Sequence, residues 1–270
     1  MSIWQSIVMG IIQGLTEFLP ISSSGHLGII PHLLGWHFAE QQTFVFDVLV
    51  QWGTLLAVIV YFWRDLLRIA TGFAQALLAR KPFGNPDARL GWYLILATIP
   101  AVVIGLLFKD AVSALFSSVR ATGGFLLVTA VILVAAELIG QRRRSFETIG
   151  WKDGLWIGLA QVVSLLPGVS RSGSTMAGAM ARNLDRPAAA RFSFLMSVPV
   201  MLGAGVLALK DLAGMPDVAA LIPPLLVGFV TAGVVGYIAI RWLITYLAGH
   251  SLYVFAGYCA VVGLLVLVLG

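Results

Sequence analysis

Apolar residues run along most of this chain in long stretches with few charges between them. We predict six membrane-spanning helices, each close to the ~20 residues that a bilayer core requires, near residues 43–63, 91–109, 120–140, 189–209, 221–245 and 251–269. Runs such as LLAVIVYFW and FLLVTAVILVAA are continuously apolar, whereas the strands of a membrane β-barrel alternate polar and apolar residues. The pattern therefore predicts an all-α polytopic membrane protein.

Two segments, 2–36 and 151–186, break this pattern. Each consists of two apolar stretches of half length, separated by a cluster of Pro, Ser and Gly residues. Because neither half is long enough to span a bilayer, we predict two re-entrant helical hairpins, each entering and leaving on one side. Irregular backbone inside a membrane is tolerated only where it is buried in protein or lines a wet cavity, so the hairpin tips are candidate sites.

The two hairpins have related sequences. Three predicted spans separate them, so they enter from opposite faces and form an inverted-topology repeat. At an offset of 148 residues, five identities align without gaps: Gly10, Gln13, Ser22, Ser24 and Gly25 match Gly158, Gln161, Ser170, Ser172 and Gly173. We predict a single membrane domain over residues 1–270, with repeat halves 1–145 and 146–270 and a site near the bilayer midplane.

Composition agrees with a membrane protein: 59% of the residues are hydrophobic, 11% are charged and the mean hydropathy is +0.96. Cys259 is the single cysteine, which excludes an intrachain disulfide. No Lys or Arg precedes Arg64, so the first apolar stretch lacks the basic region of a cleavable signal peptide and is expected to be retained.

The distribution of Lys and Arg predicts the orientation of the chain. Thirteen of the seventeen fall on one side: Arg64, Arg68, Arg80, Lys81, Arg89, Arg142, Arg143, Arg144, Lys152, Arg182, Arg186, Arg191 and Arg241. The other side has Lys109, Arg120 and Lys210, and Arg171 lies in the second hairpin tip. The positive-inside rule makes the crowded side cytoplasmic and places both termini outside. The net charge of +5 is thus explained by basic residues that set the orientation in the membrane, and we expect no nucleic-acid partner.

The second hairpin tip, LLPGVSRSGST at residues 165–175, suits an anion. Pro167 and Gly168 break the incoming half-helix, and Ser170 to Thr175 open the outgoing one. A helix N-terminus offers unpaired N–H groups and a positive dipole end. Arg171 adds a permanently charged planar fork that matches phosphate oxygens.

The first hairpin tip, QGLTEFLPISSSGH at residues 13–26, repeats this plan. Pro20 breaks the helix, Ser22 to Gly25 open the next one, and Glu17 and His26 flank the turn. Two such tips facing each other would form a phosphate cage. The alternatives are that Ser and Gly only let helices pack closely, that Glu17 and Arg171 form one structural ion pair, and that His26 is a buried, hydrogen-bonded histidine. His32 and His37 are interpreted as interfacial loop residues.

At these residues the chain resembles the bacterial undecaprenyl-pyrophosphate phosphatases of the bacitracin-resistance type. QGLTEFLPISSSGH is similar to their first motif and PGVSRSGST to their second motif, PGxSRSxxT. The likeness extends to chain length, hairpin placement and FSFLMSVPVMLGA at residues 192–204. It implies hydrolysis of undecaprenyl pyrophosphate to the monophosphate, which recycles the lipid carrier for peptidoglycan synthesis in the bacterial plasma membrane. It also implies a divalent cation and an active site open to the external face.

Carried over by position, the resemblance implies catalysis by Glu17, Ser23, His26 and Arg171, with Glu17 also the metal ligand. We predict substrate binding by Gln13, Ser22, Ser24, Ser170, Ser172, Gly173 and Thr175. Gln13 stands where many members have Glu, so only Glu17 supplies a carboxylate to Mg²⁺ or Ca²⁺, which prefer oxygen ligands. Either His26 or Ser23 attacks phosphorus, or His26 activates water with Glu17; the sequence leaves both routes open.

Two other functions are considered. A secondary transporter or flippase of phosphorylated lipids or anions would use the same inverted repeat, but binding alone needs no nucleophile beside Arg171. A second membrane phosphatase superfamily has the motifs PSGH and SRxxxxxH, yet residues 172–182 read SGSTMAGAMAR and contain no His. The expected partners are the polyprenyl pyrophosphate and membrane lipids, and the sequence leaves a homodimer open.

Overall fold

The computed structural model describes residues 1–116, 118–212 and 218–269, with side chains throughout these ranges except at 40–42, 204, 206–212 and 218–221. Within these ranges every regular element is a helix, and the only β-type contact is an isolated bridge between Arg144 and Leu184. The prediction of an all-α protein is therefore confirmed. The side chain of Lys210, one of the three cations predicted on the external side, lies outside the described residues.

The first hairpin consists of α1 (Ile3–Phe18) and α2 (Ser23–Leu33). α1 begins at a capping box between Ser2 and Gln5, an arrangement that satisfies backbone donors at a helix start. It ends just before Pro20, and Ser22 then caps α2 by accepting a hydrogen bond from the Gly25 N–H. The chain thus turns back after four residues, as the Pro and Ser cluster predicts.

The second hairpin consists of α8 (Trp151–Val162), the short 3₁₀ helix η2 (Val163–Leu165) and α9 (Arg171–Ala181). Its turn requires a glycine at Gly168, whose φ is +95° and where a Cβ would lie 2.3 Å from the carbonyl oxygen of Thr122. Ser170 caps α9 through the Gly173 N–H, as Ser22 caps α2. Both predicted hairpins have the same construction.

Six longer helices surround the hairpins: α3 (Glu40–Tyr61), α5 (Pro86–Leu107), α7 (Val119–Ile139), α10 (Arg186–Leu212), α11 (Val218–Leu247) and α12 (Tyr253–Leu269). Four segments in the described part of the chain are long and apolar enough to cross a membrane: Thr43–Tyr61, Pro86–Leu107, Val119–Ile139 and Ile222–Leu247. α12 is apolar but has 17 residues. The chain is thus a multi-pass helical membrane protein, and the count of six spans stays a prediction.

Three short elements were missed by the sequence analysis. α4 (Trp63–Leu78) follows α3 after a break at Phe62 and occupies a region interpreted as loop. It is amphipathic, and its buried face of Ile69, Gly72 and Ala76 packs against α5. α6 (Lys109–Leu115) and the 3₁₀ helix η1 (Phe146–Thr148) lie in other predicted loops. α4 was overlooked because its charged face lowers the hydropathy on which the span prediction depends.

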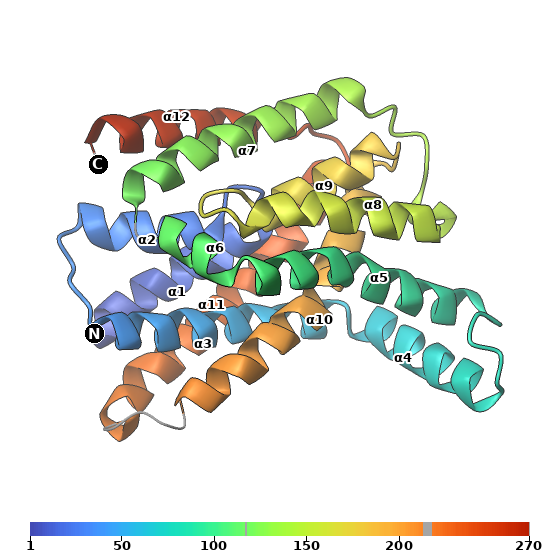
Figure 1. Ribbon diagram of the computed structural model, residues 1–270, viewed down its shortest axis with the longest axis horizontal. Coiled ribbons are helices and arrows are strands. Elements are labelled where there is room, and N and C mark those ends of the chain that lie inside the picture. The colour runs from blue at the N-terminus through green and yellow to red at the C-terminus, as the bar shows by residue number, and fades with distance from the viewer. Residues whose placement is uncertain (117, 213–217, 270) are drawn as a thin grey trace.

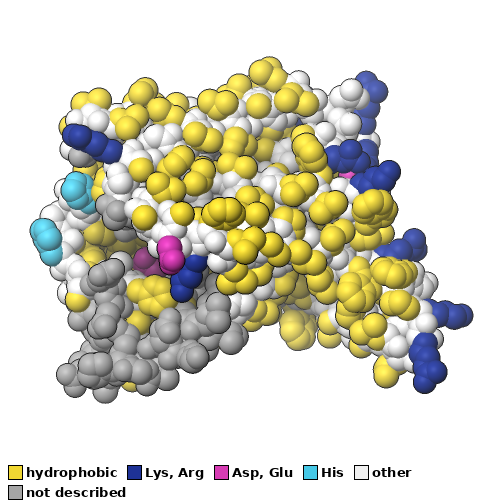
Figure 2. Space-filling model, viewed as in Figure 1, with side chains coloured by type: hydrophobic (Ala, Val, Ile, Leu, Met, Phe, Trp, Pro, Cys, Tyr) yellow, Lys and Arg dark blue, Asp and Glu magenta, His cyan; other side chains and the backbone are white. Residues whose placement is uncertain are grey.

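The two hairpins open toward opposite ends of the molecule, and both chain termini lie at the left end in Figure 1. α1 packs against α11, which in turn packs against α3, while α8 packs against α5 and α12 against α7. The lateral surface is mainly hydrophobic, and Lys and Arg gather at the right end (Figure 2). α4 and the turns between α7 and α8 and between α9 and α10 lie at this end.

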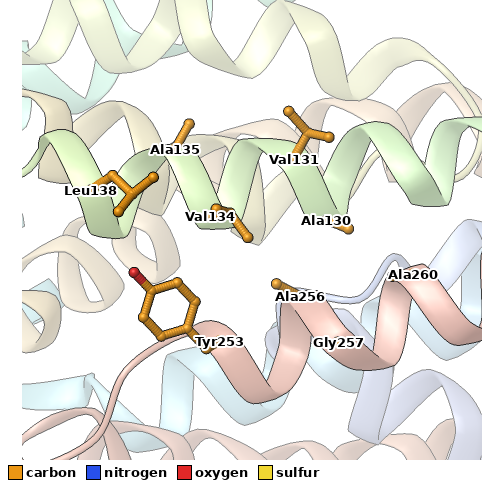
Figure 3. A pocket seen from close by; sticks show the side chains of 9 residues that line it. All are labelled: Ala130, Val131, Val134, Ala135, Leu138, Tyr253, Ala256, Gly257 and Ala260. Carbon is orange, nitrogen blue, oxygen red and sulfur yellow. The ribbon is translucent and has the colours of Figure 1, made fainter.

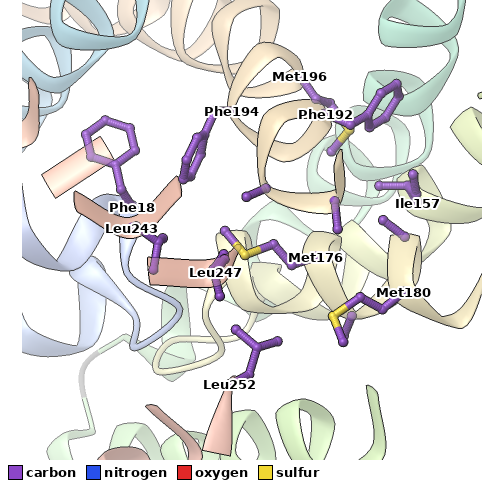
Figure 4. Close-up of a cluster of buried hydrophobic side chains, with 14 of the residues drawn as sticks. Phe18, Ile157, Met176, Met180, Phe192, Phe194, Met196, Leu243, Leu247 and Leu252 are labelled. Atoms are coloured by element: carbon purple, nitrogen blue, oxygen red, sulfur yellow. The ribbon is translucent and has the colours of Figure 1, made fainter. Parts of the chain in front are cut away.

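The hydrophobic core lies directly beside the hairpin tips (Figure 4). Phe18, Met176 and Phe194 belong to one cluster of buried side chains, and the rings of Phe18 and Phe194 meet edge to face at 5.4 Å. Phe18 follows Glu17 in the chain and Met176 follows Thr175, so core packing fixes the backbone that carries candidate site residues.

Several residues of the basic end form buried ion pairs. Asp153 accepts from Arg144 at 2.7 Å and Arg182 at 2.9 Å, and Glu137 accepts from Arg142 and Arg186. Burial opposes ionisation of Asp153, but its bonds with Arg144, the Gly150 N–H and Arg182 outweigh it and lower the pKa of this carboxyl to about 2. These basic residues therefore also join the base of the second hairpin to neighbouring loops.

Candidate active site

The two hairpin tips meet through an ion pair between Glu17 and Arg171. The Arg171 guanidinium donates from Nη2 to Glu17 Oε1 at 2.6 Å, and the side chains are 17% and 8% exposed. Glu17 lies near the end of α1, and Arg171 is the first residue of α9. The two residues are 154 positions apart in the sequence. The ion pair considered in the sequence analysis is thus present, and it joins the two predicted motifs.

The second oxygen of Glu17 accepts two further hydrogen bonds. Ser23 donates from Oγ to Glu17 Oε2 at 2.6 Å, and Gln13 donates from Nε2 to the same oxygen at 3.0 Å. Gln13 stands one helical turn before Glu17, so both side chains lie on one face of α1. The carboxylate is therefore held by donors from α1, α2 and α9, and it lies beside a hydroxyl that it could deprotonate.

Arg171 and Thr175 are anchored by α10. Arg171 donates from Nη1 to the Ser193 carbonyl at 3.3 Å, and the hydroxyls of Thr175 and Ser193 are 2.6 Å apart. Ser193 was not predicted, although it lies within the FSFLMSVPVMLGA segment of the resemblance. The sequence gives no local signal for this role, because a serine within a long apolar helix can equally face lipid or a neighbouring helix.

The predicted serines at the two tips are engaged with the backbone and with one another. The Ser22 and Ser170 hydroxyls cap α2 and α9 and lie close to those of Ser24 and Ser172, respectively. The Ser172 hydroxyl also donates to the Leu19 carbonyl at 3.2 Å. The Ser172 bond joins the two tips, and the other bonds fix the shape of each tip. Direct contact of these serines with substrate stays a prediction.

The two hairpin tips lie close to each other at their glycines. A Cβ on Gly173 would lie 3.4 Å from the Cβ of Pro20, and one on Gly25 would lie 3.4 Å from the Cα of Gly168. Each glycine thus faces the opposite tip. A Cβ at either position would already be in van der Waals contact with the opposite tip, so side chains larger than Ala would push the two helix N-termini apart.

His26 is bound by groups other than those of the ion pair. Its Nδ1 lies 2.7 Å from the Ser22 carbonyl oxygen and its Nε2 lies 2.7 Å from the Tyr258 hydroxyl on α12. Among the described contacts, none of its hydrogen bonds reaches Glu17, Ser23 or Arg171. The structure thus joins Glu17, Ser23, Gln13, Arg171 and Thr175 in one network and gives His26 a separate one.

Thr129 of α7 supports the second tip and was also missed by the sequence analysis. Its hydroxyl donates to the Gly168 carbonyl and accepts from the Ser170 N–H, both at 3.0 Å. One buried hydroxyl therefore satisfies two backbone groups in an irregular turn, which would otherwise be costly to bury.

A cation site can be assessed from the oxygen donors present. The described residues contain no group of three or more His, Cys, Asp or Glu side chains that could hold a metal. The Oε1 atom of Gln13 is buried and has no protein partner, next to the Glu17 carboxylate. One carboxylate and one free amide oxygen, with substrate phosphate, fit a hard cation such as Mg²⁺ or Ca²⁺.

An apolar groove on the lateral surface is not a phosphate site. It lies between α7 and α12, has a volume of about 510 Å³, and is lined mostly by aliphatic side chains (Figure 3). The Tyr253 hydroxyl is the one polar side-chain group in its lining. The groove thus lacks the charged donors that a pyrophosphate requires, whereas the hairpin tips have them. His32 lies in the last turn of α2 and not in a loop as predicted. With His37 it lines a separate groove that does not join the tips.

Comparison with known proteins gives a consistent result. The chain matches the model of the family described as bacitracin resistance protein BacA over residues 6–265. It is 43% identical over 277 residues to an undecaprenyl-diphosphatase of Chloroherpeton thalassium, covering 99% of this chain and 96% of that protein. It is 45% identical over 278 residues to one of Chlorobium chlorochromatii, with the same coverage. It is 43% identical over 272 residues to one of Mycobacterium ulcerans, covering 100% and 97%.

Proposed function

This chain belongs to the family of the bacitracin resistance protein BacA, and from that premise we propose that its two hairpin tips form the active site of an undecaprenyl-diphosphatase. The reaction is the hydrolysis of undecaprenyl pyrophosphate to undecaprenyl phosphate and inorganic phosphate, which serves cell-wall synthesis. The relatives described above are named for this hydrolysis, which favours it over the transporter or flippase alternative.

The observation that carries the site assignment is the pair of short contacts on Glu17. One carboxylate oxygen accepts from Arg171 and the other accepts from Ser23, each at 2.6 Å. A hydroxyl bound to a carboxylate is the arrangement of a nucleophile with its general base. An arginine beside that pair supplies positive charge where the phosphoryl group must lie.

These contacts favour Ser23 over His26 as the attacking group. Glu17 accepts the Ser23 proton as Oγ attacks the terminal phosphorus, and the bridging P–O bond breaks to release undecaprenyl phosphate. Water then attacks the phosphorus of phosphoserine, and the Ser23 oxygen leaves and recovers its proton from Glu17. His26, which is then not the attacking group, accepts a proton from that water.

Arg171 would stabilise the charge that develops on the transferred phosphoryl group. Its Nη2 is occupied by Glu17 and its Nη1 by the Ser193 carbonyl at 3.3 Å, a long bond. A phosphate with two or more charges can compete for these N–H groups, because charge-assisted bonds to Arg are strong. The helix N-terminus that begins at Arg171 adds backbone donors.

Gln13 and Glu17 are the residues that would hold a divalent cation. When bound, Mg²⁺ or Ca²⁺ would neutralise phosphate charge and favour departure of the leaving group. Gln13 contributes the neutral oxygen that has no protein partner, and Glu17 contributes the carboxylate.

The architecture of the site follows from an inverted repeat of halves 1–145 and 146–270, with six spans and two re-entrant hairpins. The packing of α1 on α11 and of α8 on α5 supports it, since the two hairpins have corresponding neighbours.

Lys and Arg gather at one end of the molecule, which supports an orientation in the plasma membrane with that end cytoplasmic. The termini and the mouth of the site would then be external, and the polyprenyl tail would lie in lipid. A homodimer and the absence of a nucleic-acid partner stay predictions.

Phosphate release from undecaprenyl pyrophosphate by the purified protein tests this function. We expect release that a chelator abolishes and that Mg²⁺ or Ca²⁺ restores. Ser23→Ala and Arg171→Ala should each lose at least about 100-fold in turnover, while Ser145→Ala in an exposed loop should not. Acid quenching with a labelled terminal phosphate should yield phosphoserine at Ser23.

A folding control is needed because Arg171→Ala leaves the buried Glu17 without its cation. The double variant Glu17→Gln with Arg171→Ala removes both charges and should unfold at nearly the wild-type temperature while remaining inactive. Absence of phosphate release by the wild type would refute the function. Normal turnover by Ser23→Ala would refute only the nucleophile.

A further inference from the structure

The last helix of the chain reaches the first hairpin tip at two consecutive residues. The Tyr258 hydroxyl lies 2.7 Å from His26 Nε2, and the two rings are nearly parallel, 16° apart, with centroids at 5.6 Å. The Cys259 thiol lies 3.8 Å from the Pro20 carbonyl oxygen. α12 therefore contacts the turn that carries Ser23, although it is more than 230 residues away along the chain.

The hydrogen bonds of His26 determine which ring nitrogen carries the proton. A backbone carbonyl only accepts, so the Ser22 carbonyl requires a proton on Nδ1. In the neutral imidazole Nε2 is then the acceptor, and the Tyr258 hydroxyl is its donor. The ring is thus held at both nitrogens, in one tautomer and one orientation.

The Ser22 side of this arrangement is rigid. Ser22 has a φ of 72°, in the left-handed region that residues other than glycine rarely adopt, and its hydroxyl caps α2. Its carbonyl direction is therefore fixed by the turn. Tyr258 binds the other ring nitrogen of His26 from a different helix. The Tyr258 residue is 42% exposed, whereas His26 is buried.

We propose that Tyr258 is a positioning residue for the hydrolysis: its hydroxyl holds the His26 ring through Nε2, and Nε2 becomes the proton acceptor at the first tip when a water takes the place of that hydroxyl. The inference rests on the proposed function and assigns a role to a residue outside both motifs. A base needs a third group to orient it and select its tautomer. Without the phenol, His26 keeps only the Ser22 bond and its ring is free to tilt, so a smaller fraction of molecules presents Nε2 correctly.

The kinetic test is a double-mutant cycle of Tyr258→Phe and His26→Ala. Tyr258→Phe keeps the stacked ring and removes the hydroxyl, and we expect kcat to fall roughly three- to tenfold, the effect of one hydrogen bond, with KM little changed. In the His26→Ala background it should cause no further loss, because Tyr258 acts through His26. Tyr253→Phe, a tyrosine of the same helix in the apolar groove, is the matched control.

A spectroscopic test does not depend on activity. In protein labelled with ¹⁵N-histidine, the His26 signals, assigned by their absence in His26→Ala, should show a protonated Nδ1 and an accepting, hydrogen-bonded Nε2. Tyr258→Phe should shift the Nε2 signal, and Tyr253→Phe should not. This measurement on the wild type keeps the proposal testable if Tyr258→Phe folds poorly.

The outcomes separate the two proposals. A wild-type protein that releases no phosphate refutes the proposed function, whatever the spectrum. An active wild type with a proton on His26 Nε2 refutes the role of Tyr258 alone. Unchanged kcat in Tyr258→Phe, or an equal loss with and without His26, also refutes it.

Discussion

The buried carboxylates of Glu17 and Asp153 each accept from several donors. Glu17 accepts from Arg171, Ser23 and Gln13, and Asp153 accepts from Arg144, Arg182 and a backbone N–H. A buried charge is tolerated only when it is paired and hydrogen-bonded in this way. At Glu17 the donors include the hydroxyl that we propose as the nucleophile and an arginine suited to phosphate, whereas at Asp153 they are fixed by loops and serve stability.

Asp153 should make the protein sensitive to acid. Its pKa is lowered from about 3.8 to about 2, so the unfolded chain binds the proton more readily, and this stabilisation is present above pH 3.8 and is lost as the pH falls toward 2. The contribution is about 2 kcal/mol of unfolding free energy. Asp153→Asn should therefore lower Tm at about pH 6 and flatten its acid dependence. Asp110→Asn, at an exposed site on α6, should do neither; an unchanged acid slope in Asp153→Asn would contradict the assignment.

Among the helices, the pair α7 and α12 connects the two tips. Thr129 of α7 binds the second tip, and Tyr258 of α12 binds His26 of the first. The helices pack closely at two glycines: a Cβ on Gly123 would lie 2.8 Å from Val266 Cγ1, and one on Gly263 would lie 2.8 Å from the Gly123 carbonyl oxygen. The spacing of this pair thus affects both halves of the site.

Adjacent glycines provide a matched test of this packing. Gly123→Ala should destabilise the protein by about 1–3 kcal/mol, because the added methyl group overpacks the contact with Val266, and it should reduce turnover. Gly124→Ala meets open space and should be neutral or slightly stabilising, since Ala favours a helix over Gly. Tm and phosphate release measure both. Equal effects of the two substitutions would show that α7 and α12 are not closely packed there.

For the molecule as a whole, charge and topology predict one orientation in the membrane. The basic residues gather at one end (Figure 2), and the two termini lie at the other (Figure 1). The hairpins open toward opposite ends while their tips meet through Glu17 and Arg171. Neither hairpin alone contains the whole site, so the fold must bring the halves together before any turnover is possible.

Single-cysteine labelling tests the orientation. In a Cys259→Ala background, Ser113→Cys on α6 should react with an impermeant maleimide added to intact cells. Ser145→Cys, which is exposed at the basic end, should react only after the membrane is permeabilised. The reverse labelling pattern would show that the topology is the opposite of the predicted one. Reaction of both sites in intact cells would contradict the prediction that they lie on opposite sides of the membrane.

The helical class, the two hairpins and the candidate motifs were all predictable from local sequence. Long apolar runs specify helices in a membrane because every backbone polar group must be satisfied within the segment. Pro20, Pro167 and Gly168 interrupt two of these runs, and capping serines restart them. α4 was missed because amphipathic helices resemble polar loops when only mean hydropathy is considered.

The contacts between distant segments were decided only by the tertiary structure. The sequence left open whether Glu17 and Arg171 would pair, which hydroxyl would face the carboxylate, and what would bind His26. Ser193, Thr129 and Tyr258 carry no local signal of function, since each is a polar residue within an apolar helix that could equally face a neighbouring helix or lipid. Their roles depend on helix rotation and packing, which are set by side-chain fit across the whole core rather than by any one segment.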